Sequence, residues 1–591
     1  MTGTPDTSAT TPAPFDAVPD AIRAARQYVP TDANPADVDQ LTALAQGLLD
    51  RELDTSAKLN RWLDDYSELS AFISEAGSRR HVAKACDTED PDVDAAFLHW
   101  VQTVSPALAP LHDKLHRKFL DCPHHTALDR PGIGIMIREW RDEVELFREA
   151  NVPLFVDARK LSVSYDKLIG AMSVDVDGES LTLPQATAKL ESTDRPLRES
   201  VWKKVAARRL QDRDAIDDVF DELLAKRQKI AENAGHANFR DYTWKSFGRY
   251  DYTPDDCHAF AAAIEHAVVP KVADLDRRRR DRLGVDPLRP WDIAPDPRGR
   301  DPLHPFDRDD DDALVARSHQ LIADLDGDLG TYFATLKPGR NLDLVSRTGK
   351  RAGGFQASMS ESREPFIFMN AAGVHRDVET MLHEAGHAFH YLASAENVDL
   401  VFVRHAPIEF CEVASMSMEL LGGPHLGVFY DDADANRARV THHEGVLRVF
   451  PWIATIDQFQ HWLYTNPGHT RDDRTQAWLD IRARFDTGEV DWSDHEASRA
   501  ADWQRQLHLF HHPFYYIEYG IAQVGALQVW ANFRRDPAAA LADYKAALAL
   551  GHTRSLPDLF AAAGISFDFT QQTLTPLIND LAATAEALDA A

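Results

Sequence analysis

The chain has 591 residues and a formal net charge of -30, because 94 acidic side chains stand against 64 basic ones. An acidic surface repels phosphate backbones, which argues against nucleic acid as a partner. No apolar run approaches the roughly 18 residues that cross a bilayer, so no membrane partner is expected either. A hydrophobic content of 44% is that of an ordinary globular protein, and the length predicts two lobes around a large interior.

The first residues of the sequence are not expected to form a signal peptide. Residues 1–20 lack a basic segment followed by an apolar one, so they predict a short disordered tail and not a signal peptide. The four cysteines, Cys86, Cys122, Cys257 and Cys411, lie too far apart to indicate a disulfide framework or a cysteine-based zinc site. These features favour a cytoplasmic location.

Amphipathic helices are predicted in succession from about residue 21 to about residue 230, because apolar positions recur every three and four residues. Two stretches are less regular. Residues 154–168 predict short strands or turns, and residues 177–190 predict a turn, a brief extended piece and a helix. Residues 284–312 contain six prolines and repeated aspartates, which indicates a long solvated surface loop after a solvated helix end at 277–280.

A convincing strand is predicted at one place, near the middle of the chain. Residues 341–370 combine glycines at turns with the short apolar run PFIFMN, Pro365 to Asn370, which is typical of a β-strand. Helices are predicted again from there to the C-terminus. We expect an N-terminal helical lobe over residues 21–198 and a catalytic domain over residues 199–591.

The stretch VETMLHEAGHAFHYLA, residues 378–393, has the helical period and contains H-E-x-x-H in His383, Glu384 and His387. Residues four apart share a helix face, so both imidazoles can reach one tetrahedral zinc ion. Glu384 lies about 100° around the helix and is free to act as general base toward a zinc-bound water. With 26 histidines in the chain the motif alone is only suggestive, and hydrogen-bonded core histidines are the alternative.

A catalytic zinc site needs a third protein ligand. His390 lies near the same face but one turn further on, which favours a supporting or core position. Other donors stand on a second predicted helix, IEFCEVASMSMELLGGP, for which Pro407 is a plausible first residue. By spacing alone Glu409, Glu412 or Glu419 could reach the metal. Glu412 and Glu419 share a face, so one of them would orient a histidine instead.

These residues resemble a known family, the M3 metallopeptidases. The resemblance rests on His383 to His390, on Phe410 to Ser415 and on Glu419, and Ala414 is typical of the oligoendopeptidase F branch, where thimet-type members have proline. It extends to LRPWD at Leu288, to GGF at Gly353, to PFIFMN and to HLFHHPFYYIEYGIAQ from His508. The family likeness implies Glu412 as the third ligand and one zinc ion per chain.

The resemblance also implies a fold class and further site residues. The fold would be mainly α, a two-lobed helical metallopeptidase with a zincin-type catalytic helix pair and a small β element beside the active site. The family places a histidine and tyrosines where they can stabilise the oxyanion. His508 and Tyr519 are the first choices here, followed by Tyr515 and Tyr516. His390 and Glu419 would support the ligands.

The strand PFIFMN gains a role from this resemblance. An exposed strand edge beside the metal can bind substrate backbone by β-strand addition, which is indifferent to side chains. Glycines before it would allow close backbone approach. The expected substrate-binding residues are Gly353, Gly354, Phe355, Phe366 and Phe368. A small structural hairpin is the alternative.

The resemblance implies a zinc-dependent endopeptidase that hydrolyses internal bonds of short oligopeptides. A carboxypeptidase on the same scaffold is the first alternative, and an inactive peptide-binding protein is the second. The presence of every residue that hydrolysis requires argues against the second alternative. The sequence does not predict the oligomeric state or the side-chain preference.

Overall fold

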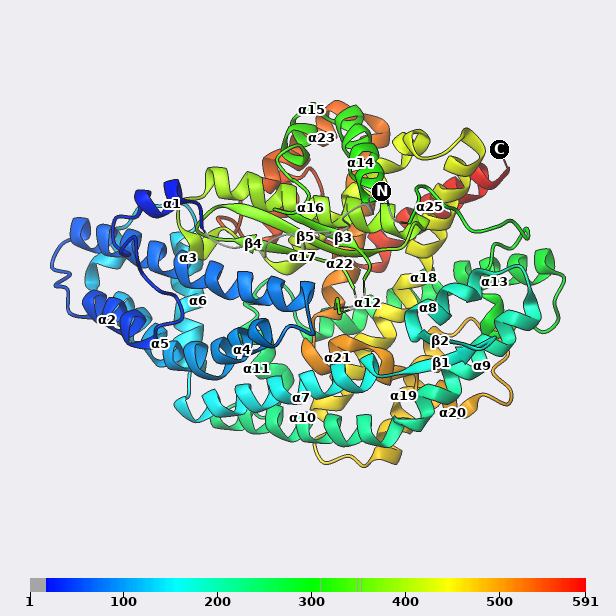
Figure 1. Ribbon diagram of the computed structural model, residues 1–591, viewed down its shortest axis with the longest axis horizontal. Coiled ribbons are helices and arrows are strands. Elements are labelled where there is room, and N and C mark those ends of the chain that lie inside the picture. Colours follow the sequence, from blue (N-terminus) through cyan, green and yellow to red (C-terminus); the bar gives the residue numbers. More distant parts are fainter. Residues whose placement is uncertain (1–17, 309, 348, 352, 591) are drawn as a thin grey trace, which may run out of the picture. The chain divides into compact units, whose positions relative to one another are not determined.

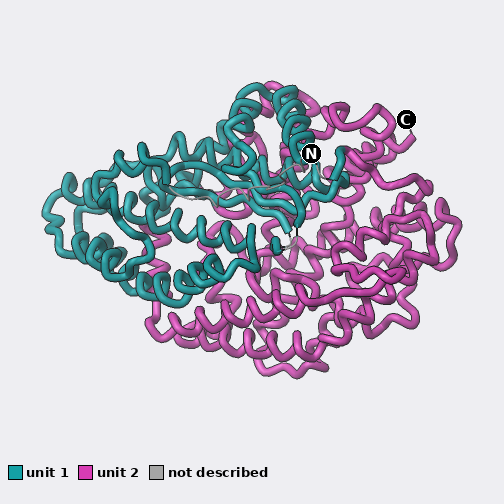
Figure 2. Tube along the Cα trace, viewed as in Figure 1, with its two compact units in different colours: residues 1–136, 306–406, 545–554 teal, residues 137–305, 407–544, 555–591 magenta. Residues whose placement is uncertain are grey.

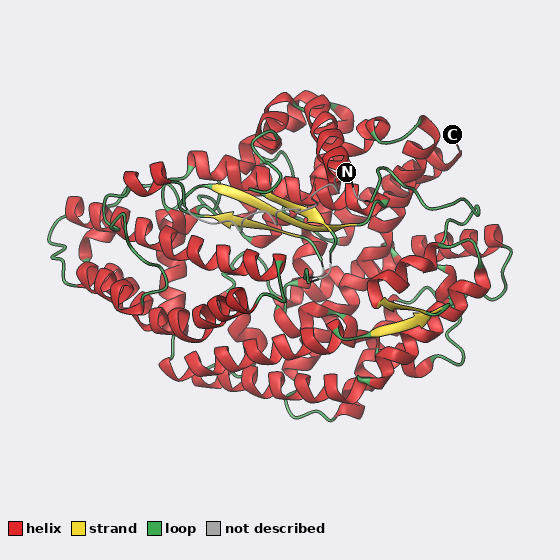
Figure 3. Cartoon of the chain, viewed as in Figure 1, coloured by secondary structure: helices red, strands yellow, loops and turns green. Residues whose placement is uncertain are grey.

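The computed structural model describes residues 18–308, 310–347, 349–351 and 353–590, so most of the tail expected over residues 1–20 lies outside the described residues. The chain forms two compact units (Figure 2). Unit 1 comprises residues 1–136, 306–406 and 545–554, and unit 2 comprises residues 137–305, 407–544 and 555–591. Helices dominate both units (Figure 1, Figure 3), which confirms the mainly α fold class. The boundary expected at residue 198 stays a prediction.

The elements of unit 1 are α1 (Asp20–Ala25), α2 (Val38–Leu49), α3 (Ser56–Cys86), α4 (Pro91–His99), α5 (Ser105–Asp121), α14 (Asp311–Leu325), α15 (Gly327–Phe333), α16 (His375–Asn397), β3 (Leu342–Val345), β4 (Phe355–Met359) and β5 (Glu364–Ala371). Two helices cross a unit boundary: α6 (Ile133–Leu146) and α23 (Pro537–Leu548). Short 3₁₀ or π segments are η1 (Trp100–Val104), η2 (Pro123–Ala127), η3 (Glu149–Asn151), η4 (Lys189–Glu191), η5 (Pro290–Asp292), η6 (Val401–Val403), η7 (Gly423–Val428) and η8 (Asp502–Arg505).

The elements of unit 2 are α7 (Val152–Gly170), β1 (Ser173–Val176), β2 (Glu179–Thr182), α8 (Leu183–Ala188), α9 (Arg195–Gln211), α10 (Arg213–Asn233), α11 (Phe239–Ser246), α12 (Pro254–Ala267), α13 (Val269–Leu283), α17 (Ile408–Gly422), α18 (Asp432–Thr465), α19 (Arg471–Phe485), α20 (Glu496–Ala500), α21 (Leu507–His511), α22 (Tyr516–Arg535), α24 (Leu556–Ala562) and α25 (Gln571–Ala590). Every helix in the described part of the chain is too short or too polar to cross a bilayer.

The prediction of strands or turns over residues 154–168 is wrong, because this stretch lies within the continuous helix α7. Its buried face includes hydroxyl groups, which a search for apolar periodicity does not count. The Ser162 hydroxyl donates to the Phe510 carbonyl at 2.9 Å, and the Tyr165 hydroxyl donates to the Gln504 carbonyl at the same distance. By contrast, residues 177–190 form the turn, strand and helix that were predicted, in β2 and α8.

From the end of α13 to residue 308 the proline-rich stretch is mostly irregular, as predicted, but it is not a solvated linker. Leu288 and Trp291 are buried in it. The fully buried Asp292 carboxylate accepts hydrogen bonds from Arg195 and Arg198, each at 3.0 Å. Buried apolar and paired polar side chains therefore hold this segment against the rest of unit 2, since a buried charge is stable only when it is paired.

The helix end at 277–280 is also less solvated than predicted. Arg279 is buried there, and its guanidinium donates a hydrogen bond to the Pro295 carbonyl. The basic run therefore includes one structural side chain of the interior.

The three-stranded sheet of unit 1 has the order β3-β5-β4, with β3 parallel and β4 antiparallel to β5. The expectation that PFIFMN forms an exposed edge is therefore wrong, because β5 is the central strand. Its continuous apolar run is typical of a strand that is covered on both faces. Phe366 and Phe368 pack with Val82 and Ala85 of α3 in a buried core, so their side chains do not face a substrate. The edge strands are β3 and β4, and each of them pairs only with β5 among the described strands.

Two helices enclose this sheet. α3 contacts β4, and α16 contacts both β4 and β5; Figure 1 shows α16 above the strands and α3 below them. The Tyr391 hydroxyl of α16 donates to the Met359 carbonyl of β4 at 2.8 Å. The sheet therefore fixes the position of α16, the helix that carries H-E-x-x-H.

In unit 2, α17 packs along α22. A Cβ atom placed on Gly525 of α22 would lie 2.7 Å from Cγ2 of Val413, so the two helix axes approach as closely as they do only because residue 525 is glycine. The Tyr544 hydroxyl donates to the Ala414 carbonyl at 2.7 Å and secures α17 on another side. This packing positions Glu412 relative to the tyrosines of α22.

Candidate metal centre and its surroundings

The helix α16 begins at a well-formed cap. A carboxylate oxygen of Asp377 accepts hydrogen bonds from the backbone N–H groups of Ala372 and Val374, at 2.8 and 2.9 Å, which satisfies donors near the helix start. Six residues further on, the motif histidines His383 and His387 are partly exposed in a helix whose other residues here are buried. Their ring centroids lie 4.8 Å apart, so both imidazoles project from one face.

Glu384 stands beside the start of β4. Its side chain is buried, and a Cβ atom placed on Gly354 would lie 3.6 Å from Glu384 Oε1 and 3.1 Å from Thr380 Cγ2. Gly353 has a φ of +98°, a conformation that side-chain-bearing residues rarely adopt. The two glycines therefore allow the backbone at the start of β4 to lie close to the predicted general base.

His390 lies in the interior of unit 1 and not at the partly exposed face. Its side chain is 4% exposed. Burial lowers the pKa of His390 to about 3, with smaller contributions from the charges of His387 and His405. A neutral, buried imidazole one turn beyond the motif fits the supporting or core position expected from the sequence, which stays a prediction.

The three competing carboxylates of α17 have different surroundings. The Glu412 carboxylate accepts hydrogen bonds from the Tyr515 hydroxyl at 2.8 Å and from the Ser415 hydroxyl at 3.1 Å. By contrast, Glu409 accepts a hydrogen bond from a buried tyrosine hydroxyl, that of Tyr252, at 2.6 Å. The Glu419 carboxylate lies 3.0 Å from Nε2 of His442. α17 begins at Ile408, with Pro407 as its N-cap residue and not, as expected, its first residue.

Among the described residues, His383 and His387 of unit 1 and Glu412 of unit 2 are candidate metal ligands. Two imidazoles and one carboxylate are the donor set that catalytic zinc sites use when one coordination position stays open. The donors therefore fit a divalent metal by their chemistry. The two helices that carry these donors were both predicted from the sequence, and only the position of Pro407 at the start of the second helix differs.

Two side chains far from the motif hold His508 in one orientation and one tautomer. The Trp452 indole N–H donates to Gln506 Oε1 at 2.9 Å, which turns the amide nitrogen of Gln506 toward Nδ1 of His508 at 2.7 Å. An amide nitrogen can only donate, so Nδ1 accepts and the proton of the neutral ring sits on Nε2. That nitrogen lies 3.4 Å from the hydroxyl oxygen of Tyr519.

Burial keeps these groups in their hydrogen-bond-donating forms. It lowers the pKa of His508 to about 4, against the opposing influence of the Glu412 charge. It also raises the pKa of Tyr519 and of Tyr515 well above 10, and the charge of Glu412 adds to both shifts. His508 is therefore neutral and both phenols are protonated at neutral pH. Tyr516 lies against the same histidine, with ring centroids 4.9 Å apart.

The loop between α21 and α22 contains a strained residue whose backbone is held by hydrogen bonds with neighbouring side chains. Phe514 has a φ of +68°, which costs a residue with a side chain on the order of 1–3 kcal/mol. The buried Arg249 guanidinium donates to the Phe514 carbonyl and, at 2.6 Å, to Glu518 Oε1. Gln460 Oε1 accepts from the Phe514 N–H at 2.5 Å. These contacts, which no spacing in the sequence indicates, fix the turn that presents Tyr515.

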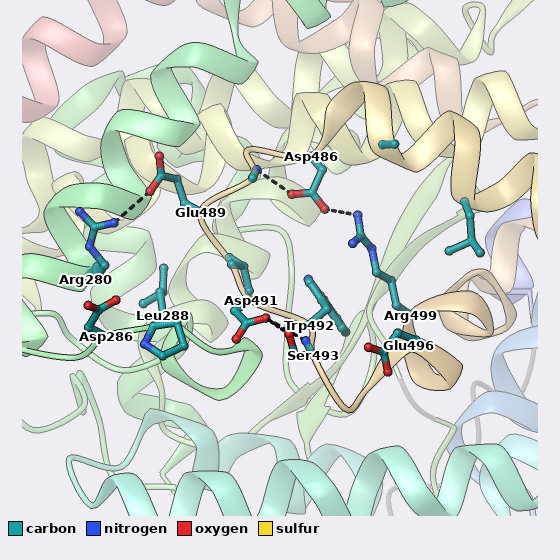
Figure 4. Close-up of a pocket in the computed structure, with 15 residues that line it drawn as sticks. Arg280, Asp286, Leu288, Asp486, Glu489, Asp491, Trp492, Ser493, Glu496 and Arg499 are labelled. Atoms are coloured by element: carbon teal, nitrogen blue, oxygen red, sulfur yellow. Dashed lines mark hydrogen bonds and ion pairs between the residues drawn. The ribbon is translucent and has the colours of Figure 1, made fainter.

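A pocket of about 740 Å³ lies elsewhere in unit 2 (Figure 4). Its lining includes none of the site residues that the sequence predicts. Its arginines are paired, Arg280 with Glu489 at 3.2 Å and Arg499 with Asp486, so neither offers an uncompensated positive charge. The pocket therefore does not change the choice of site.

A helix that bears H-E-x-x-H, with a buried glutamate on a second helix, defines the class of zincin-like metallohydrolases. Comparison with known families makes this specific. The model of peptidase family M3 matches residues 188–297 and 336–577, and that of the peptidase M3 N-terminal domain matches residues 30–147. The chain belongs to peptidase family M3, whose members are metal-dependent peptidases. The family resemblance found in the sequence is thus confirmed.

Curated relatives match over part of their length. An oligoendopeptidase F homologue of Borreliella burgdorferi is 22% identical over 249 residues, which is 41% of this chain and 40% of the relative. The oligopeptidase PepF of Bacillus subtilis is 24% identical over 243 residues, 40% of this chain and 35% of the relative. The matched segment thus spans less than two thirds of either protein.

Solved structures match over nearly the whole chain. A structure of PZ peptidase A with an inhibitor has a TM-score of 0.88 at 25% identity, and covers 96% of this chain and 99% of its own. An oligoendopeptidase F structure has the same TM-score and coverages at 28% identity. These similarities confirm the expected M3 fold.

Proposed function

We propose that the protein is a zinc-dependent endopeptidase that hydrolyses internal peptide bonds of short oligopeptides. The observation that carries the proposal is the donor group of His383, His387 and Glu412, with Glu384 between the histidines, in a chain of family M3. Oligopeptide cleavage is what the names of its relatives describe. One zinc ion would be held by these three side chains.

A bound zinc ion would supply a Lewis acid that polarises the scissile carbonyl and lowers the pKa of the attacking water. The protein's own groups do the rest. Glu384 is not among the proposed ligands, and its carboxylate would accept a proton from that water and deliver it to the leaving amine. Its burial at 5% exposure limits competing solvent. The Tyr515 hydroxyl, which donates to Glu412, would fix the orientation of the third ligand.

His508 and Tyr519 would stabilise the negative charge that develops on the carbonyl oxygen. The donors would be the Nε2–H group of the imidazole and the O–H group of the phenol. Their two heavy atoms lie 3.4 Å apart. Both groups keep their protons at neutral pH because of their shifted pKa values. Donors placed before the reaction cost no reorganisation when the charge appears.

Tyr519→Phe is therefore expected to lower kcat by about 10²–10³-fold, the usual cost of one oxyanion donor. The KM should change little, because the lost hydrogen bond forms in the transition state. Tyr516→Phe is the matched control, since its ring contacts the same histidine. Steady-state kinetics on a quenched peptide measure both variants. An equal loss in the two variants would assign the effect to packing around His508.

The substrate backbone would pair with the free edge of β4, which begins next to Glu384. Pairing through main-chain groups gives affinity without selecting side chains. Gly353, Gly354 and Phe355 lie at the start of this edge and stay in the proposal as substrate-binding residues. Phe366 and Phe368 are not proposed as substrate-binding residues, because they are buried in the core.

Product mapping on one long peptide, combined with metal removal, tests the function. We expect cleavage at internal bonds, loss of cleavage after treatment with a chelator, and recovery when zinc is restored. Removal of residues one step at a time from the C-terminus would instead identify a carboxypeptidase. Cleavage that persists in the chelated protein would overturn the metal-dependent mechanism.

A further inference from the structure

A second cluster of potential metal ligands lies within unit 2, on helices that carry no predicted site residue. Cys257 comes from α12, and Asp457 and His461 come from α18, four residues apart on one face. Their ligand atoms all lie within 4.8 Å of one another. All three side chains are buried, with exposures of 0%, 0% and 2%.

The polar atoms of this cluster are poorly satisfied by the protein. Within the described part of the chain, neither ring nitrogen of His461 has a hydrogen-bond partner, and neither has Oδ1 of Asp457. Nε2 of His461 is 3.4 Å from Asp457 Oδ2, a contact too poorly aligned for a hydrogen bond. Buried polar groups are almost always hydrogen-bonded, so these buried polar atoms without partners require an explanation. Asp457 Oδ2 accepts a hydrogen bond from Gln458 Nε2 at 3.3 Å, and the rings of Trp244 and Phe514 pack against His461.

We propose that Cys257, Asp457 and His461 form a structural metal site for zinc, distinct from the catalytic centre. Charge favours a divalent ion: one thiolate and one carboxylate neutralise it, so no net charge is buried. Binding releases the Cys257 proton to solvent as the sulfur–metal bond forms. The mixture of sulfur, nitrogen and oxygen donors suits zinc or cobalt and disfavours calcium and magnesium, which take oxygen ligands.

The three side chains leave one coordination position to be filled. Structural zinc takes four ligands. His258 stands beside the cluster, its ring centroid 4.6 Å from that of His461 and its Nδ1 2.7 Å from Gln458 Oε1. His258 or a water molecule would complete the coordination.

Cobalt substitution of the full-length protein tests this site separately from the catalytic one. The probe is Co²⁺ alone, added to metal-free protein carrying His383→Ala and His387→Ala, which removes the catalytic ligands. We expect one equivalent of tightly bound Co²⁺ and a thiolate-to-cobalt charge-transfer band in the near ultraviolet. The proposed catalytic centre contains no sulfur ligand, so the band reports a cysteine ligand.

Matched cysteine variants identify the ligand. Cys257→Ser in the same background should abolish the band and the bound equivalent, whereas Cys86→Ser, at a cysteine in unit 1, should change neither. Asp457→Asn provides a second variant if Cys257→Ser does not fold, and it should weaken Co²⁺ binding. A double-histidine variant that binds no metal and gives no band would overturn the site. A band that survives Cys257→Ser would overturn the assignment.

His258→Ala distinguishes the two sources of the fourth ligand. A changed cobalt spectrum assigns that position to His258, and an unchanged one assigns it to water. Zinc should also raise the Tm of the double-histidine variant but not that of its Cys257→Ser derivative. Because the catalytic ligands are absent throughout, a failure here leaves the proposed peptidase function standing, and a failed peptidase assay leaves this site standing.

Discussion

Glu384→Gln is expected to abolish peptide hydrolysis while the metal stays bound. The amide is isosteric with the carboxylate but cannot accept a proton, and general base catalysis contributes about 10²–10⁴-fold to such reactions. Glu384 is not part of the candidate metal-binding group, so metal content should stay at the wild-type value. Steady-state kinetics on a quenched peptide and elemental analysis of the same preparation measure the two properties.

Glu396→Gln is the matched control on the same helix. Glu396 is exposed near the end of α16, where its carboxylate accepts a hydrogen bond from the Tyr332 hydroxyl at 2.7 Å, and its neutralisation should leave kcat within the error of the wild type. Unchanged hydrolysis in Glu384→Gln would refute the proposed role of this carboxylate. Loss of metal in Glu384→Gln would show that the residue helps to hold the ion, which the mechanism does not allow.

Glu412→Gln is expected to lower the affinity for zinc, and activity with it. The variant loses the only charged donor of the proposed ligand set, so the loss should exceed the roughly 10–100-fold that removal of an outer-shell partner costs. Competition with a chromophoric chelator gives the dissociation constant of the metal. Added zinc should restore part of the activity, because the two imidazoles remain.

Glu409→Gln is the control one turn away on α17. An amide oxygen can still accept the hydrogen bond from the Tyr252 hydroxyl, and Arg249, which lies 3.9 Å from Glu409, keeps its shorter ion pair with Glu518 at 2.6 Å. Zinc affinity should stay at the wild-type value in this variant. Equal loss of zinc in both variants would contradict the choice of Glu412, and loss in Glu409→Gln alone would transfer the ligand role to Glu409.

The helices that carry the metal ligands could be predicted from the sequence because their signals are local. Two histidines four residues apart need only a regular helix to share a face. The choice among Glu409, Glu412 and Glu419 could not be made from spacing, because it depends on which side chains surround each carboxylate. Tyr252 contacts Glu409 across 157 residues of sequence, and Tyr515 contacts Glu412 across 103.

Other contacts in the site could not be predicted from sequence patterns either, because they also join residues that are far apart in the sequence. Arg249, which belongs to no motif, braces the strained Phe514 across 265 residues. Gln506 lies two residues before His508, but its contact with this histidine depends on Trp452, which fixes the orientation of its amide. The PFIFMN strand was predicted correctly, yet its place in the sheet depends on β3 and β4. An apolar run without alternation indicates burial on both faces, which points to the centre of a sheet.

The free edge of β4 has a consequence for the protein's own solubility. An open strand edge is a template for any extended chain, including the edge of a second copy, and long open edges promote aggregation. β4 is only five residues long, about 17 Å at roughly 3.4 Å per residue. At its far end the Met359 carbonyl is already engaged by Tyr391. A strand edge of this length can pair reversibly with a short peptide, but it is too short to nucleate an intermolecular sheet.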